Sequence, residues 1–263
     1  MNQKLKLYQV DAFTDKLFHG NPAGVCILKT WPEVNVMQHI AAENNLPETA
    51  FIVQKMHEVE IRWFTPTIEV DLCGHATLAS AHVLFTYYTP EINLINFFSP
   101  RSGFLEVERK EEWLTLNFPK DTYTKIEVPE VLINAFQITP IEAFRGKSDF
   151  LLIYGSQRDI EDMNPDLAMI ASIGGRGVIV SAPGTTVDFV SRFFAPQSGI
   201  NEDPVTGSAH TTLTPYWSHK TGKSRLTALQ LSKRGGELVC EMAGLRVLIS
   251  GKAVTYMIGE IVI

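Results

Sequence analysis

The sequence has 263 residues, is 45% hydrophobic and carries a formal net charge of −6, so it can bury a full globular core. This acidic balance argues against a general binder of nucleic-acid backbones, because that affinity depends on clustered Lys and Arg. The three cysteines, Cys26, Cys73 and Cys240, form no C-x-x-C pair and predict neither a disulfide framework nor a zinc knuckle.

The amino-terminal residues and the hydropathy of the chain bear on where the protein is found. Residues 1–20 alternate polar with apolar side chains and lack the continuous apolar segment of a signal peptide. No apolar run reaches the roughly 18 residues of a membrane-spanning helix. The sequence therefore predicts a cytoplasmic protein with no membrane partner and no nucleic-acid partner.

Strands and helices alternate in the first half of the chain. Polar–apolar alternation predicts strands over 4–13, 23–28, 50–54, 59–64, 92–98, 103–110 and 113–118. Apolar residues three and four positions apart predict helices over 32–44 and 74–87. The second helix is mostly apolar and carries small residues, so we expect it to be central in this half.

The second half repeats this order after a crossover over 120–148, which contains a short predicted helix at 131–136. It has predicted strands over 150–154, 177–181, 187–194, 228–232, 237–242 and 245–250, and predicted helices over 165–173 and 207–218. Final strands over 254–263 are expected to complete the sheet of the first half. The predicted fold is α+β with two pseudo-symmetric halves, 1–119 and 120–253, each a curled, mostly antiparallel sheet around a central helix.

Two stretches of the sequence occur twice. Segment 62–66 (R-W-F-T-P) matches 192–196 (R-F-F-A-P), and segment 73–77 (C-G-H-A-T) matches 206–210 (T-G-S-A-H). The offset is 130 residues between Pro66 and Pro196, and 133 between Gly74 and Gly207. The offset of 133 continues as Ser99, Arg101, Gly103 and Leu105 meet Ser232, Arg234, Gly236 and Leu238. The repeat predicts two similar halves, each with one helix start behind an aromatic strand.

The segment 199–210, G-I-N-E-D-P-V-T-G-S-A-H, has the composition of a helix start. The unpaired backbone N–H groups at such a start attract anions. Gly74 and Gly207 lack side chains, so a carboxylate can approach these N–H groups closely. We expect the two helix starts to bind the carboxylate of a small anionic substrate.

Four side chains near these segments could take part in catalysis, and three have a structural alternative of their own. Glu48 could take and return a proton in a closed cleft, or it could be a solvated turn residue. His75 could be a neutral donor whose pKa the helix start lowers, could orient the substrate, or could be structural. Asp203 could act in catalysis or cap the helix. Ser208 is the counterpart of His75, so both copies present a hydrogen-bonding side chain at this position.

Four motifs in this order resemble the phenazine-biosynthesis PhzF-like family. They are D-A-F-T-x-x-x-F-x-G-N-P-A over 11–23, L-P-E-T-A-F over 46–51, L-C-G-H-A-T over 72–77 and G-I-x-E-D-P-V-T-G-S-A over 199–209. The resemblance covers nearly the whole chain. It implies the fold of diaminopimelate epimerase and proline racemase, with the active site in the cleft between two similar halves, and it implies a homodimer.

The resemblance also assigns roles to residues of this sequence. Glu48 would be the base of an isomerase, without cofactor or metal, that relocates a proton on a small cyclic or unsaturated carboxylic acid. Asp203 would hydrogen-bond the substrate and His75. With Ser208, these residues would position the substrate and stabilise developing charge. Asn21, in the first motif, is a further expected substrate-binding residue.

Three other functions stay open at this point. Racemases of this fold use two thiols as acid and base, but Thr206 is the counterpart of Cys73, which disfavours a symmetric epimerase of amino or hydroxy acids. Cys73 is then best interpreted as a small buried residue. Ser208, His75 and Asp203 are the ingredients of a hydrolytic triad, although no G-x-S-x-G motif surrounds Ser208. The third alternative is a non-catalytic protein that binds a small molecule.

Overall fold

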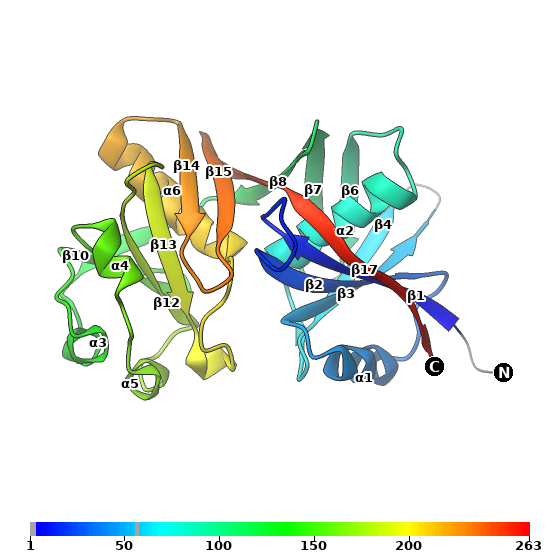
Figure 1. Cartoon of the computed structure of the whole chain (residues 1–263), viewed down its shortest axis with the longest axis horizontal. Helices are drawn as coiled ribbons and strands as arrows, with labels where there is room; N and C mark the ends of the chain where they lie inside the picture. Colours follow the sequence, from blue (N-terminus) through cyan, green and yellow to red (C-terminus); the bar gives the residue numbers. More distant parts are fainter. Residues whose placement is uncertain (1–3, 56–57) are drawn as a thin grey trace. The chain divides into compact units, whose positions relative to one another are not determined.

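Two mostly buried helices, α2 (Gly74–Tyr87) and α6 (Gly207–Thr221), each pack against the sheet of a separate unit of the chain (Figure 1). The computed structural model describes residues 4–55 and 58–263. One unit is Met1–Asn117 with Ser250–Ile263, and the other is Phe118–Ile249. Each unit therefore contains one copy of the repeated helix start.

The sheet of the first unit contains both antiparallel and parallel neighbours. Its strands are β1 (Lys4–Ala12), β2 (Asn21–Leu28), β3 (Glu48–Gln54), β4 (Val59–Phe64), β5 (Glu69–Val70), β6 (Leu94–Ser99), β7 (Gly103–Lys110), β8 (Trp113–Pro119) and β17 (Ala253–Val262). β1 pairs antiparallel with β17 and β2, and β2 pairs parallel with β3. Beyond β3, the pairs β3–β4, β4–β5, β6–β7 and β7–β8 are antiparallel, and β4–β6 is parallel.

Alternate residues of these strands face opposite sides of the sheet. On one side, Phe51 and Phe64 form a buried cluster with Met37 and Ile40 of helix α1 (Val34–Asn44), and the two rings pack edge to face at 5.5 Å. The alternation turns Ile52 to the other side, where α2 packs against β1, β2 and β3. Figure 1 shows α1 and α2 on opposite sides of β2 and β3.

The second unit has a sheet of the same kind. Its strands are β9 (Tyr123–Ile126), β10 (Glu142–Gly146), β11 (Asp149–Ile153), β12 (Gly177–Pro183), β13 (Phe189–Phe194), β14 (Arg225–Gln230), β15 (Gly236–Ala243) and β16 (Arg246–Gly251). The pairs β11–β12 and β13–β14 are parallel. The pairs β9–β10, β10–β11, β12–β13 and β14–β15 are antiparallel.

Helices cover both faces of this second sheet. Three short helices, α3 (Glu130–Phe136), α4 (Gln157–Glu161) and α5 (Leu167–Ala171), contribute Phe136, Ile160 and Ile170 to a buried cluster that includes Phe194. α6 packs against β14 and β15. Its Trp217 stacks on Phe189 with ring centroids 5.8 Å apart.

The predicted duplication is visible in the order of strand pairings. Starting from β1–β2, the first unit runs antiparallel, parallel, antiparallel, parallel, antiparallel through β6–β7. Starting from β10–β11, the second unit runs through the same sequence to β14–β15. In each unit one long helix starts at the repeated glycine and packs on its own sheet. This arrangement matches the predicted halves built on a central helix.

An ion pair is repeated as well. Arg62 of β4 donates to both carboxylate oxygens of Glu69 at 2.7 and 2.8 Å, and Arg192 of β13 donates to both oxygens of Glu202 at 2.7 and 3.1 Å. Such two-fold contacts fix geometry as well as charge. In both units the pair ties the aromatic strand to the segment that leads into the buried helix.

One part of the predicted repeat is wrong. The hairpin β6–β7 pairs Ser99 with Gly103, whereas β14–β15 pairs Gln230 with Gly236. Gln230, and not Ser232, is therefore the counterpart of Ser99, because the second turn (231–235) is longer than the first (100–102). The 133-residue offset is restored only at Gly103 and Gly236.

Helix α6 continues through Pro215, which cannot donate to the carbonyl of Thr211 one turn earlier. The amide of Asp121 donates to that carbonyl at 3.1 Å instead. The Asp121 carboxylate also accepts the Thr212 hydroxyl at 2.8 Å. The segment after β8 thus satisfies the carbonyl that the proline leaves free.

Among the described residues, none of the helices has both the length and the apolar character needed to cross a bilayer.

Glu142 of β10 provides a test of how the second unit resists acid. Hydrogen bonds from Tyr216 and Lys220, at 2.6 and 2.9 Å, lower the pKa of this carboxyl to about 2. The unfolded-state pKa is higher, about 4.3. The stabilisation is therefore present above the unfolded value and is lost as pH falls toward 2.

Replacing Glu142 by Gln is expected to lower the free energy of unfolding at pH 7 by about 1–2 kcal/mol. The difference from wild type should shrink between pH 5 and pH 3, in urea unfolding followed by circular dichroism. Glu127→Gln, at an exposed position of the same unit, is the control. A difference between Glu142→Gln and wild type that stays constant down to pH 3 would contradict the assigned pKa shift.

Candidate active site

Glu48 is the first residue of β3, where it pairs with Ala23 of the parallel strand β2. Its exposed fraction is 9%. The sequence placed Glu48 between a helix and a strand beginning at residue 50, with a solvated loop-end or turn residue as the alternative. That boundary is wrong by two residues, because β3 already pairs at Glu48. The carboxylate is buried rather than solvated.

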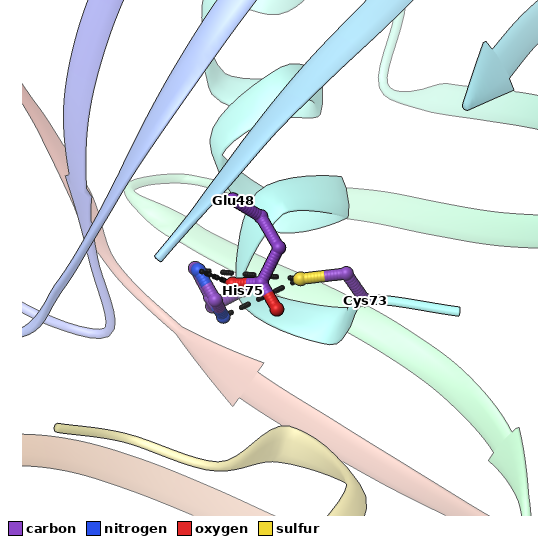
Figure 2. A group of neighbouring side chains, drawn as sticks. All are labelled: Glu48, Cys73 and His75. Carbon is purple, nitrogen blue, oxygen red and sulfur yellow. Dashed lines mark hydrogen bonds and ion pairs between the residues drawn. The ribbon is translucent and has the colours of Figure 1, made fainter. Parts of the chain in front are cut away.

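His75, the second residue of α2, lies against Glu48 and Cys73, as Figure 2 shows. Its Nε2 is 3.2 Å from Glu48 Oε2, and its Nδ1 and Nε2 are 3.5 and 4.0 Å from Cys73 Sγ. All three side chains are buried. Strand β3 supplies the carboxylate, and the start of α2 supplies the imidazole and the thiol. These are also donor types that hold metal ions.

The protonation of His75 is set by these neighbours. Burial by itself lowers the pKa of an imidazole, but the Cys73 sulfur and the Glu48 carboxylate raise the pKa of His75 well above its usual range. Burial raises the pKa of the Cys73 thiol to about 11, so this thiol is neutral at pH 7. The Glu48 carboxylate is thus the charge that favours an imidazolium. A lowered pKa for His75, one of the alternatives that the sequence left open, is wrong, because the contacts with Cys73 and Glu48 outweigh burial and the partial charge of a helix start.

Asn21, the first residue of β2, contacts the other ring nitrogen of His75. Its side-chain amide lies 3.2 Å from Nδ1, and Asn21 is fully buried. An imidazolium carries a proton on Nδ1, so the amide oxygen has to face that proton to accept its hydrogen bond. Asn21 therefore orients the ring of His75. Direct contact between Asn21 and substrate stays a prediction.

In the second unit, Thr206 holds the position of Cys73 and contacts Asp203. The Thr206 hydroxyl donates a 2.6 Å hydrogen bond to Asp203 Oδ2. The amide of Gln230 donates to the Asp203 carbonyl at 2.8 Å and accepts the Thr206 N–H at 2.8 Å. The Thr206 side chain makes no capping bond to α6. The buried Asp203 therefore fixes the residue that precedes the helix.

Ser208, the second residue of α6, contacts a cation that the sequence analysis missed. Arg176 donates from Nη1 to Ser208 Oγ at 2.9 Å. Arg176 Nε donates to the buried Asp149 at 2.9 Å, and Nη2 bonds the second oxygen of the same carboxylate. The guanidinium also lies 5.3 Å from the ring centre of Phe193. The available signal in the sequence was position: Arg176 lies directly before β12, and Glu48 is the first residue of β3.

The surroundings of Ser208 argue against a hydrolytic nucleophile. A nucleophilic serine donates its proton to a neighbouring base. The Ser208 oxygen instead accepts a hydrogen bond from a guanidinium. His210, two residues along α6, donates from Nδ1 to the Thr206 carbonyl at 2.8 Å, and burial lowers its pKa to about 4.

Glu48 has no counterpart in the second unit. In the first unit, Thr49 pairs with Phe64, and Glu48 is the residue before Thr49. In the second unit, Val178 pairs with Phe194, and the residue before Val178 is Gly177. A Cβ on Gly177 would lie only 2.8 Å from the Phe194 carbonyl oxygen. The backbone thus excludes a carboxylate side chain at the second position. The duplicated fold carries one buried glutamate of this kind.

Comparisons with known proteins agree with the architecture. Residues 10–259 match the family model described as phenazine biosynthesis-like protein, PhzC-PhzF. An uncharacterized isomerase of Pseudomonas aeruginosa is 47% identical over 258 residues, which cover 98% of each chain. The crystal structure of a PhzF-family protein of Enterococcus faecalis has a TM-score of 0.96 at 44% identity, over 98% of this chain and 99% of that chain.

A more distant structure shows how widely the fold is shared. A hydroxyproline epimerase from Agrobacterium vitis has a TM-score of 0.64 at 10% identity, over 99% of this chain and 93% of that chain. At this identity the likeness concerns the fold alone.

Proposed function

The chain belongs to the PhzC-PhzF family of phenazine biosynthesis-like proteins and is an enzyme of the isomerase class, and we propose that it moves a proton between two carbons of one small carboxylic acid. We further propose that the acid is cyclic or unsaturated, and that the reaction needs no cofactor. The observation that carries this proposal is the single buried glutamate: Glu48 lies 3.2 Å from His75, while Gly177 replaces it in the second unit.

The proposed reaction uses Glu48 as both acceptor and donor. The Glu48 carboxylate takes a proton from a C–H next to the unsaturated system, and the electron pair of that bond shifts into the conjugated carbons. Glu48 then returns the proton to a different carbon of the same molecule. The product has the composition of the substrate, so no redox partner or co-substrate is required.

His75 supports the charge that develops in this step. As an imidazolium it places a positive charge beside the carboxylate and beside the carbanion that forms when the C–H proton leaves. Asn21 holds the ring from the opposite nitrogen. The neutral thiol of Cys73 is not assigned a proton-transfer role, in keeping with the raised pKa of that group.

We assign the second unit to substrate binding. The start of α6 at Gly207 offers backbone N–H groups to a carboxylate, and Arg176 adds a full positive charge next to Ser208. Asp203 holds Thr206 at this start, and we keep it as a group that hydrogen-bonds the substrate.

Replacing Arg176 by Met is expected to raise the KM for an anionic substrate by about 10–100-fold, which corresponds to a hydrogen bond to a charged group. The kcat should change much less, because Arg176 is not assigned to the proton transfer. Arg176→Lys should recover part of the loss, since it keeps the charge but not the two-fold contact with Asp149.

Arg158→Met, at an exposed position of α4, is the matched control. In Arg176→Met the buried Asp149 loses a partner. Thermal unfolding of each variant therefore separates an effect on binding from a loss of structure. A KM unchanged in folded Arg176→Met would contradict the assignment of substrate binding to this residue.

The experiment that tests the proposed function is hydrogen exchange in D₂O. A panel of cyclic and unsaturated small acids, together with saturated amino and hydroxy acids, is incubated with the protein and followed by NMR. We expect an unsaturated acid to gain deuterium at carbon and to change its double-bond pattern. Exchange at the α-carbon of both mirror-image forms of a saturated acid would instead indicate an epimerase. Labelling of Ser208 by a fluorophosphonate would indicate a hydrolase.

A further inference from the structure

Three different metal-binding groups meet at the start of α2. The carboxylate of Glu48, the sulfur of Cys73 and a ring nitrogen of His75 lie within 4.8 Å of one another, and all three residues are buried (Figure 2). Cys73 directly precedes α2, His75 is the second residue of that helix, and Glu48 comes from β3. Neither of the other cysteines, Cys26 and Cys240, belongs to such a group among the residues that the structure describes.

The spacing of these donors is close to that of a zinc site. Tetrahedral Zn²⁺ has bonds of about 2.0–2.2 Å to nitrogen and oxygen and about 2.3 Å to sulfur, so its donors are roughly 3.3–3.6 Å apart. Here His75 Nε2 is 3.2 Å from Glu48 Oε2 and 4.0 Å from Cys73 Sγ. The Nε2–Sγ distance exceeds the tetrahedral spacing by about 0.4 Å, and all three donors lie within 4.8 Å of one another. Three protein ligands would leave the fourth position to water.

A second observation points to a missing partner. Glu48 Oε2 is buried, and within 4–55 and 58–263 its ion pair with His75 at 3.2 Å is not accompanied by any well-aligned hydrogen bond. A buried carboxylate oxygen is costly to leave without a partner. On the far side of the ring, Asn21 contacts Nδ1, in the place of the outer partner that fixes a metal-bound histidine.

The charges also balance. A thiolate and a carboxylate neutralise a divalent cation, and a neutral imidazole completes the set. Binding releases the thiol proton and the Nε2 proton to solvent, and no oxidant or reductant is involved. The start of α2 favours anions over cations, so both anionic ligands are needed to hold the metal there.

We infer that Glu48, Cys73 and His75 form a binding site for a thiophilic divalent cation of the Zn²⁺ class, and that occupancy of this site switches the isomerase off. The binding itself is independent of the proposed function, whereas the inhibitory effect rests on Glu48 being the base. Cys73 then has a part in regulation although it has none in proton transfer.

Cobalt titration of the metal-free full-length protein tests the site. Co²⁺ bound through a thiolate has a thiolate-to-metal absorption band, which reports the sulfur ligand directly. We expect about one equivalent of Co²⁺ to produce this band, Zn²⁺ to remove it, and Cys73→Ser to abolish it. Cys240→Ala, which removes a buried cysteine elsewhere, should leave the band unchanged. Circular dichroism and the Tm establish that both variants are folded.

Zinc binding measured by calorimetry gives the second readout. We expect Cys73→Ser to weaken Zn²⁺ affinity by more than about 100-fold. Loss of a residue that only supports a metal ligand costs at most about 100-fold, so a larger loss indicates a direct ligand. Absence of the cobalt band in wild type, or its persistence in folded Cys73→Ser, would overturn the site.

In the D₂O assay, Zn²⁺ should stop hydrogen exchange catalysed by wild type but not exchange catalysed by Cys73→Ser. Exchange that is present but insensitive to bound Zn²⁺ would refute the switch, whereas exchange that is absent without metal would count against the proposed function.

Discussion

Replacement of Glu48 by Gln is expected to reduce turnover by about 10²–10⁴-fold, the usual contribution of general acid–base catalysis. The amide keeps the shape of the side chain but cannot accept the proton that leaves carbon. Because His75 and the start of α6 are unchanged, the KM should rise by less than the kcat falls. The measurement is the rate of deuterium gain at carbon, followed by NMR at saturating substrate.

Glu43→Gln is the control for this experiment, because Glu43 is an exposed glutamate at the end of α1, close to Glu48 in the chain. It should exchange at the wild-type rate. A Glu48→Gln variant that is folded and turns over as fast as Glu43→Gln would remove Glu48 from the mechanism. The fold and the repeated ion pairs would be unaffected by that result.

Replacement of Trp63 by Ala is expected to lower the free energy of unfolding by about 3–5 kcal/mol, because it empties a large volume in a close-packed core. Trp63 lies in β4 and is fully buried. Its indole N–H is also buried and has no hydrogen-bond partner among the described residues. The repeat places Phe193 at the equivalent position of the second unit, also buried.

This equivalence predicts a different result for Trp63→Phe. The phenyl ring leaves a smaller cavity, and it removes a buried unpaired donor that costs about 1–3 kcal/mol. The two terms oppose each other, so we expect a change within about 1 kcal/mol of wild type. Urea unfolding of both variants, followed by circular dichroism, measures the difference. Equal destabilisation by Phe and by Ala would show that the indole makes a specific contribution that the repeat does not explain.

Much of the architecture could be predicted from periodicity and repetition. Helix α2 begins and ends at the predicted residues, Gly74 and Tyr87, because its apolar and small residues recur at helical spacing and a glycine opens it. The duplicated R-x-F and G-[HS]-A segments predicted two similar halves. Periodicity failed for short pieces: β5, β9, β10 and α4 have too few residues to show a period.

The site was harder to predict than the fold, because its properties depend on tertiary contacts. The motifs pointed to Glu48 and His75, but the lowered pKa that the sequence left open for His75 has the wrong direction, because Cys73 and the Glu48 carboxylate of β3 raise that pKa. Arg176 was missed because its position directly before β12 does not reveal its contacts. Its role follows from Asp149 and Ser208, which are 27 and 32 residues away in the chain.

The central claim is that one asymmetric glutamate carries a proton from one carbon to another within the same molecule. It is tested most directly by a single turnover in D₂O with the unsaturated acid that the screen identifies. A single base that keeps the abstracted proton delivers part of the substrate's own hydrogen, so we predict a product with less than one solvent deuterium at the receiving carbon. Complete incorporation of one solvent deuterium from the first turnover would contradict the claim that the proton taken from one carbon is the proton delivered to the other.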